Sequence, residues 1–116
     1  MGFFQDLITY FIPGEEEKRF PGIPFVDLTE LKILSAPNPE DFYPPYSKHS
    51  GEKGKVRLLL SVHQSGKVVS TRIVKSSDFA RLDQAAAKLS SQFLFDDYLY
   101  NNTVSPFQTS IEIEFR

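Results

Sequence analysis

Val56-Arg-Leu-Leu-Leu-Ser-Val-His63, Gln64-Ser-Gly-Lys67 and Val68-Val-Ser-Thr-Arg-Ile-Val74 are the three consecutive pieces of sequence that decide the fold. In the first piece the apolar side chains at Val56, Leu58, Leu60 and Val62 alternate with others, which is typical of a strand with one buried face. Gly66 can adopt the positive φ that a tight turn requires. The stretch therefore predicts an antiparallel β-hairpin.

A helix is predicted directly after this hairpin, over residues 79–93. Its apolar side chains recur at helical spacing, and Ser76-Ser77-Asp78 supplies candidates for the N-cap. The members of this apolar stripe are Leu82, Ala85, Ala86, Leu89 and Phe93. Residues 98–106 are polar and rich in turn-forming residues, so we expect a loop there.

The last ten residues, Phe107-Gln-Thr-Ser-Ile-Glu-Ile-Glu-Phe115-Arg116, alternate again and predict a final strand. The predicted order is β-β-α-β, an α+β fold in which a three-stranded antiparallel sheet carries one helix on one face. We expect the final strand to lie at a sheet edge, where unpaired N–H and C=O groups can pair with an extended peptide.

The first part of the chain differs in character, since seven of the eight prolines precede residue 51. We predict an N-terminal arm over residues 1–41 and a domain over residues 42–116. Residues 2–12 carry a helical apolar stripe without basic residues. This favours packing on the protein itself, or the remnant of a longer segment, over binding to a membrane or to a partner's groove. Residues 25–34 fit either a strand or a short helix.

Composition argues against several classes of function. A net charge of −2 argues against a nucleic-acid partner, and the lack of cysteine excludes disulfides and Cys–zinc sites. The two histidines, His49 and His63, lie in polar surroundings that do not favour a shared metal site. We find no Gly-x-Ser-x-Gly motif and no phosphate-binding glycine loop. The sequence thus predicts a protein without catalytic residues, metal or cofactor.

Five pieces of the sequence, in order, resemble the C-terminal domain family of TonB, the energy transducer of Gram-negative outer-membrane transport. They are Tyr43-Pro44, Lys53-Gly54-Lys55-Val56, Ser65-Gly66-Lys67-Val68, the passage from Ile73-Val74-Lys75-Ser76-Ser77 to Leu82-Asp83-Gln84-Ala85-Ala86, and the terminal strand. The family commonly ends its helix with Trp-x-Tyr/Phe-x-Pro, where this chain has Phe93-Leu94-Phe95-Asp96. Phenylalanine can take the aromatic role, so the fold is expected to persist.

The resemblance implies a periplasmic module that captures the TonB box, an extended peptide of outer-membrane transporters, by strand addition. It also implies coupling to inner-membrane proteins that harvest energy. The implied peptide site is the terminal strand with a flanking Tyr-Pro pair: Gln108, Thr109, Ser110, Ile111, Glu112, Ile113, Glu114 and Phe115, with Tyr43 and Pro44. A full transducer has a membrane anchor and a long Pro-rich spacer, so this stretch alone is not expected to transduce energy. With an upstream anchor, it would be held at the inner membrane.

Two alternatives stay open at this point. The terminal strand can pair with the chain's own arm or with a second copy in a homodimer, in place of a foreign peptide. The chain can also be a structural or assembly component of an envelope or secretion complex that uses a TonB-like fold and docks through its N-terminal arm.

Overall fold

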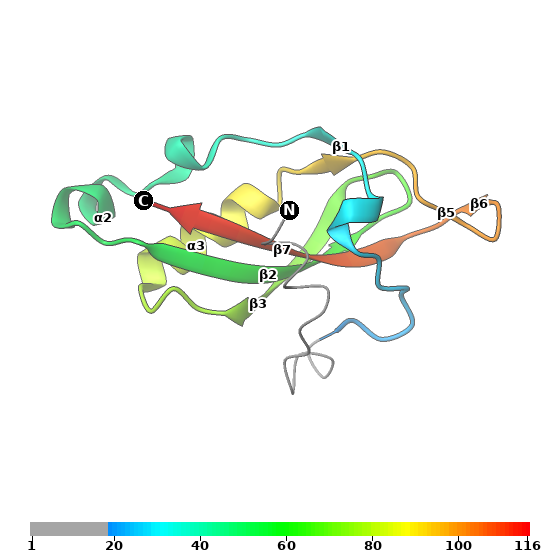
Figure 1. The fold of residues 1–116 in the computed structure, drawn as a ribbon, viewed down its shortest axis with the longest axis horizontal. Coiled ribbons are helices and arrows are strands. Elements are labelled where there is room, and N and C mark those ends of the chain that lie inside the picture. The colour runs from blue at the N-terminus through cyan, green and yellow to red at the C-terminus, as the bar shows by residue number, and fades with distance from the viewer. Residues whose placement is uncertain (1–18) are drawn as a thin grey trace.

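A three-stranded antiparallel sheet in the order β3-β2-β7 forms the centre of the structure (Figure 1). Its strands are β2 (Gly54–Val62), β3 (Val68–Lys75) and β7 (Phe107–Phe115). The computed structural model describes residues 19–116. The segment predicted to be amphipathic, residues 2–12, lies outside the described residues.

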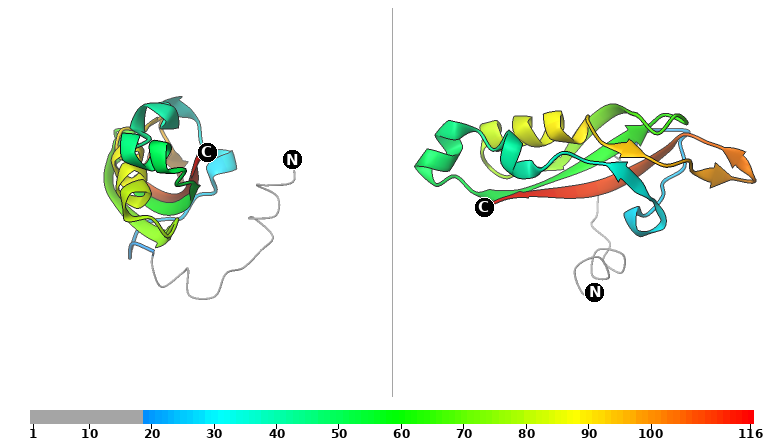
Figure 2. Two further views of the ribbon diagram at one scale, coloured as in Figure 1. Left: turned by 90° about the vertical axis from the view of Figure 1, so that its left-hand side faces the viewer. Right: turned by 90° about the horizontal axis from the view of Figure 1, so that it is seen from above.

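The helix α3 (Ala80–Ser90) covers one face of this sheet (Figure 2). Leu82, Ala86 and Leu89 of the helix are fully buried, and so are the side chains of β2 that face it, Val56, Leu58, Leu60 and Val62. Burying a leucine side chain of this kind stabilises the fold by about 1.5–3 kcal/mol. The predicted α+β fold, with a three-stranded antiparallel sheet and one main helix, is confirmed.

The two neighbours of β2 pair with it differently. The register between β2 and β7 runs without interruption from Gly54 opposite Phe115 to Val62 opposite Phe107. The register between β2 and β3 shifts twice, once near each end of the pairing. The terminal strand is therefore the more regular partner of the central strand.

Shorter elements complete the described chain. They are the 3₁₀ turns η2 (Leu28–Glu30) and η3 (Pro39–Phe42), the helix α2 (Pro45–Ser50), and the two-residue or three-residue strands β1 (Ile33–Ser35), β4 (Leu94–Phe95), β5 (Leu99–Tyr100) and β6 (Thr103–Val104). Residues 25–34 thus contain a 3₁₀ turn followed by the start of a strand, and β1 pairs with β4. The expected loop at 98–106 contains a small hairpin, because Asn101 and Asn102 both adopt positive φ.

The end of α3 differs from the sequence prediction. The helix ends at Ser90, three residues before the predicted Phe93. The hydroxyls of Ser90 and Ser91 donate hydrogen bonds to the carbonyls of Ala86 (2.6 Å) and Lys88 (2.6 Å). Such side-chain bonds compete with a continuing helix, and the chain then turns into β4. Phe93 therefore lies outside the helix.

The start of α3 also differs, since none of the three predicted N-cap residues occupies the cap. Phe79 does, and its side chain makes no capping hydrogen bond. The carboxylate of Asp83 instead accepts bonds from the Ser76 hydroxyl (2.5 Å), the Ser77 hydroxyl (2.7 Å) and the Ser77 N–H (2.9 Å). Partial burial by itself raises the pKa of Asp83, but these bonds outweigh it and lower that pKa below its ordinary value.

The hairpin turn between β2 and β3 lies against the chain that leaves α3. Gly66 has a φ of 91°, as predicted for the turn, and its carbonyl accepts a hydrogen bond from the Phe95 N–H at 2.9 Å. A Cβ atom at position 66 would lie 2.0 Å from the Phe95 carbonyl oxygen. Glycine is therefore required here for two reasons, the backbone conformation and the close approach of another backbone.

Within the described range 19–116, we find no helix long and apolar enough to cross a membrane.

Gly66→Ala is expected to lower the free energy of unfolding by at least about 2 kcal/mol, because strain and a backbone clash add together. Urea denaturation measures this. Gly51→Ala is the matched control: Gly51 has a φ of 74°, but a Cβ atom there would meet only open space, so this variant should lose only the strain, about 1 kcal/mol. Equal losses in both variants would contradict the close approach to Phe95.

Asp83→Asn is expected to destabilise the protein at pH 7 by about 1 kcal/mol, because the charged acceptor of three hydrogen bonds is lost. The folded-state pKa of Asp83 is the lower one, so its stabilisation is fully present above the unfolded-state pKa of about 3.9 and disappears as pH falls through the folded-state pKa. Urea midpoints of both proteins between pH 7 and pH 3 should therefore converge. A constant difference across this range would contradict the assignment.

Candidate functional site at the outer edge of β7

The strand β7 pairs with β2 on one side only, so its other side is an edge of the sheet. Gln108 shows which main-chain groups face outward: its N–H donates to the Pro24 carbonyl (2.9 Å), and its carbonyl accepts from the Val26 N–H (2.8 Å). Both groups of Gln108 therefore point away from β2. Along an antiparallel pair this direction repeats every second residue.

The main-chain N–H and C=O groups of Ser110, Glu112 and Glu114 consequently also point away from β2. Within residues 19–116, no partner hydrogen-bonds to the outward main-chain groups of these three residues. We call them the open edge. It offers an N–H and a C=O at each of the three residues, which is the pattern that an added strand requires.

The other predicted residues of β7 hold the strand in place. The main-chain groups of Thr109, Ile111, Ile113 and Phe115 point toward β2, and their side chains are buried in the core. Their part in the site is to fix the register of the strand. They do not offer main-chain groups to a ligand.

Gln108 differs from both sets. Its side chain is 2% exposed, and its amide binds the main chain of Phe20 and Ile23. The chain's own residues 20–26 thus occupy the edge at this position. The sequence raised this alternative without indicating which residue of the terminal strand would be covered.

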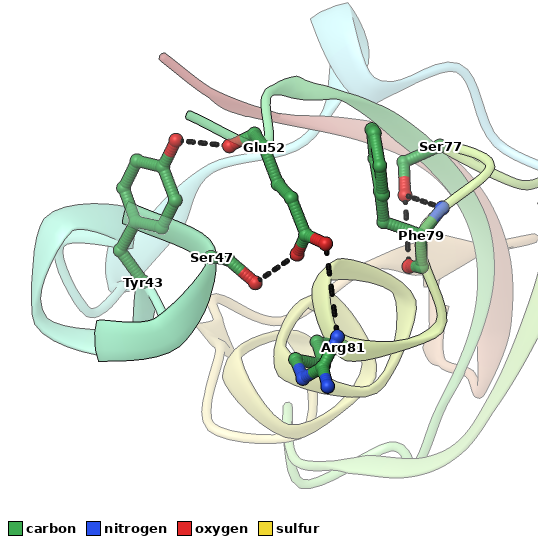
Figure 3. A network of polar contacts seen from close by, with 6 residues as sticks. All are labelled: Tyr43, Ser47, Glu52, Ser77, Phe79 and Arg81. Atoms are coloured by element: carbon green, nitrogen blue, oxygen red, sulfur yellow. Dashed lines mark hydrogen bonds and ion pairs between the residues drawn. The ribbon is translucent and has the colours of Figure 1, made fainter. Parts of the chain in front are cut away.

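Tyr43 lies at the other end of β7, where its ring contacts that of Phe115 with a centroid distance of 5.3 Å. Its hydroxyl donates to the Glu52 carbonyl (Figure 3). Pro44 follows as the N-cap residue of α2. The predicted Tyr-Pro pair is therefore near the C-terminal end of the strand, and Tyr43 is a buried part of the framework.

Glu52 joins this end of the sheet to α2 and α3, as Figure 3 shows. Its carboxylate accepts a hydrogen bond from the Ser47 hydroxyl (2.5 Å) and forms an ion pair with Arg81 (3.6 Å). The guanidinium of Arg81 in turn lies 4.1 Å from the ring centroid of Tyr46. No motif in the sequence predicted Glu52 as a junction, because its partners come from separate parts of the chain: Ser47 in α2, Arg81 in α3 and Tyr43 before α2.

Charged side chains of both signs line the outer face beside the open edge, where Glu112 and Glu114 lie opposite Arg57 and Lys55 of β2. Glu112 forms an ion pair with Arg57 (3.8 Å) that is mostly shielded from solvent, while Glu114 pairs with the exposed Arg116 (3.8 Å). The Glu114 carboxylate is partly accessible, so it favours a basic side chain on a neighbouring strand.

Among residues 19–116, no three His, Cys, Asp or Glu side chains gather as they would around a metal ion. The His63 ring is engaged in the hairpin turn, where its Nδ1 lies 3.0 Å from the Ser65 hydroxyl. The arrangement is suited to binding through the main chain.

Tyr43→Phe is expected to lower the free energy of unfolding by about 1 kcal/mol, because the Glu52 carbonyl loses its donor while the ring contact with Phe115 remains. Thermal or urea unfolding measures this. Tyr46→Phe is the matched control, since the Tyr46 side chain is 60% exposed, and its change should stay below about 0.5 kcal/mol. If the two variants lose the same amount, the Tyr43 hydroxyl does not anchor this junction.

Known proteins resemble this chain in sequence and in fold. Residues 39–116 match the family model described as Gram-negative bacterial TonB protein C-terminal. The chain is 48% identical over 50 residues to Protein TonB of Neisseria meningitidis serogroup C and 46% identical over 50 residues to that of Neisseria gonorrhoeae. Each match covers 43% of this chain and 18% of the relative.

The fold also resembles a solved structure, the solution NMR structure of the Pseudomonas aeruginosa TonB C-terminal domain. The TM-score is 0.64 at 17% sequence identity, and the alignment covers 78% of this chain and 92% of the other. This likeness concerns the fold alone. Because the family model spans the hairpin, the helix and the terminal strand together, the chain belongs to the TonB C-terminal family.

Proposed function

We propose that this chain is a periplasmic peptide-binding module that captures the TonB box of an outer-membrane transporter at the open edge. The observation that supports this most directly is the set of outward main-chain groups at Ser110, Glu112 and Glu114, which have no partner within the described part of the chain. An extended peptide can pair with all three residues while the buried side of β7 stays unchanged.

The expected affinity is modest. Each main-chain hydrogen bond contributes about 0.5–1.5 kcal/mol net, and the peptide loses conformational freedom when it binds. Electrostatics adds selectivity, because the partly exposed Glu114 carboxylate favours a basic side chain at the matching position of the peptide. Binding of this kind suits a contact that must form and release repeatedly.

The wider role follows from family membership and is part of the same proposal. The captured transporter would be coupled through the rest of the transducer to inner-membrane proteins that harvest energy. The junction of Glu52 with Ser47 and Arg81 supports a mechanical part for this end of the domain, because it ties the chain entering β2 to both helices. No catalytic step is required of the domain.

An NMR titration with TonB-box peptides tests the proposal. Amide hydrogen exchange of Ser110, Glu112 and Glu114 should slow on binding, whereas the amides of Thr109 and Ile111, already paired with β2, should change little. A peptide N-methylated at alternate residues cannot donate the pairing bonds and should leave the exchange rates unchanged.

A pair of variants provides the control on the protein side. Ser110→Pro removes one outward N–H without removing a bond to β2, and should weaken peptide binding about 3- to 10-fold. Ser110→Ala keeps the N–H and should bind like the original protein. Peptide binding that leaves the three outward amides unprotected would refute strand addition at this edge.

A further inference from the structure

Gln108 binds the chain's own N-terminal segment through five hydrogen bonds. Two involve its main chain, with Pro24 and Val26. Three involve its side-chain amide: Nε2 donates to the carbonyls of Phe20 (2.7 Å) and Ile23 (2.7 Å), and Oε1 accepts from the Phe20 N–H (2.8 Å). A single residue of β7 thus satisfies all of its polar groups with residues 20–26.

The segment occupies the position of an added strand, though only at one residue. Phe25 forms an isolated parallel bridge with Gln108, and η2 then begins three residues later, at Leu28. The outward main-chain groups of β7 are therefore paired at Gln108 and have no partner within residues 19–116 at Ser110, Glu112 and Glu114. Any longer strand added along this edge would meet the segment.

Other contacts hold the segment to different degrees. Val26 is buried in the core, whereas the Phe25 side chain is 38% exposed. The guanidinium of Arg19 lies 4.0 Å from the Phe25 ring centroid, and that of Arg72 lies 4.3 Å from the Phe20 ring centroid. Residues 20–25 are attached mainly through polar and cation–π contacts, which exchange with water more readily than a buried apolar side chain does.

We propose that residues 20–26 are a resident, displaceable occupant of this edge and that Gln108 is the residue that holds them. A foreign peptide then binds the three outward residues without competition. It gains the fourth, Gln108, only by displacing the chain's own segment. The part of this inference that concerns a foreign peptide rests on the proposed function; the attachment of the segment by Gln108 does not.

The inference makes affinity depend on peptide length. The open edge runs from Ser110 to Glu114 and is matched by a peptide of about five residues, while a peptide that also reaches Gln108 needs about seven. In the original protein the extra residues of the peptide must compete with the segment, so lengthening the peptide should increase its affinity only slightly. When the segment is loosened, the same lengthening should strengthen binding.

Titrations with nested peptides of five, seven and nine residues from one TonB box test this in the full chain. For the original protein the dissociation constant should change less than about 2-fold over the series, whereas for Gln108→Ala it should fall about 3- to 10-fold between five and nine residues. Gln64→Ala, the same substitution at an exposed glutamine of the hairpin turn, leaves all five bonds of Gln108 in place and should behave like the original protein. The same length dependence in all three proteins would overturn the inference.

A measurement without peptide tests the attachment separately. The Val26 amide, which donates to Gln108, should exchange with solvent at least about 10-fold faster in Gln108→Ala than in the original protein, with core amides of β2 unchanged. If the alanine variant exchanges faster throughout, Gln108→Met, which keeps a long side chain without the amide, replaces it. An unchanged Val26 rate in a folded variant would overturn the inference. Failure of every peptide to bind, with Val26 still accelerated, would refute the proposed function and leave the attachment confirmed.

Discussion

The antiparallel pairing of β2 with β7 is the constraint on which the rest of the structure depends. It places Ile111, Ile113 and Phe115 on the face covered by α3 and the two glutamates on the opposite face. A slip of one residue would exchange these faces, moving carboxylates into the core. The same pairing decides which main-chain groups of β7 remain available, so the stability of the fold and the proposed peptide binding depend on one register.

The sequence was sufficient to predict those parts of the fold in which apolar residues recur with a regular period. Alternating apolar residues identified β2 and β7, the turn at Gly66 identified β3 as the returning strand of the hairpin, and helical spacing located α3. The two ends of α3 could not be predicted from that spacing, because each depends on polar contacts. Ser90 and Ser91 bond to carbonyls of the last turn, and Asp83 reaches back to Ser76 and Ser77. Hydroxyl groups have several acceptors within reach, and the spacing of apolar residues does not show which one they choose.

The candidate site was predictable as a strand but not residue by residue. Side-chain direction and main-chain hydrogen-bond direction both repeat every two residues, and their relative phase depends on the partner strand. The sequence showed which side chains of β7 are buried, but not that the groups facing outward belong to Ser110, Glu112 and Glu114. The covering of Gln108 joins residues more than 80 positions apart, with no shared pattern between Ile23 and the strand to indicate it.

The two glutamates beside the open edge affect how copies of this chain can pair with one another. If two copies joined edge to edge in antiparallel fashion with Glu112 opposite Glu114, like charges would face each other across the new pair, which is destabilising. In that register the carboxylates oppose self-pairing, whereas a neutral or basic strand meets no such repulsion. A domain of this kind can be present at high concentration and still keep its edges available to a different molecule.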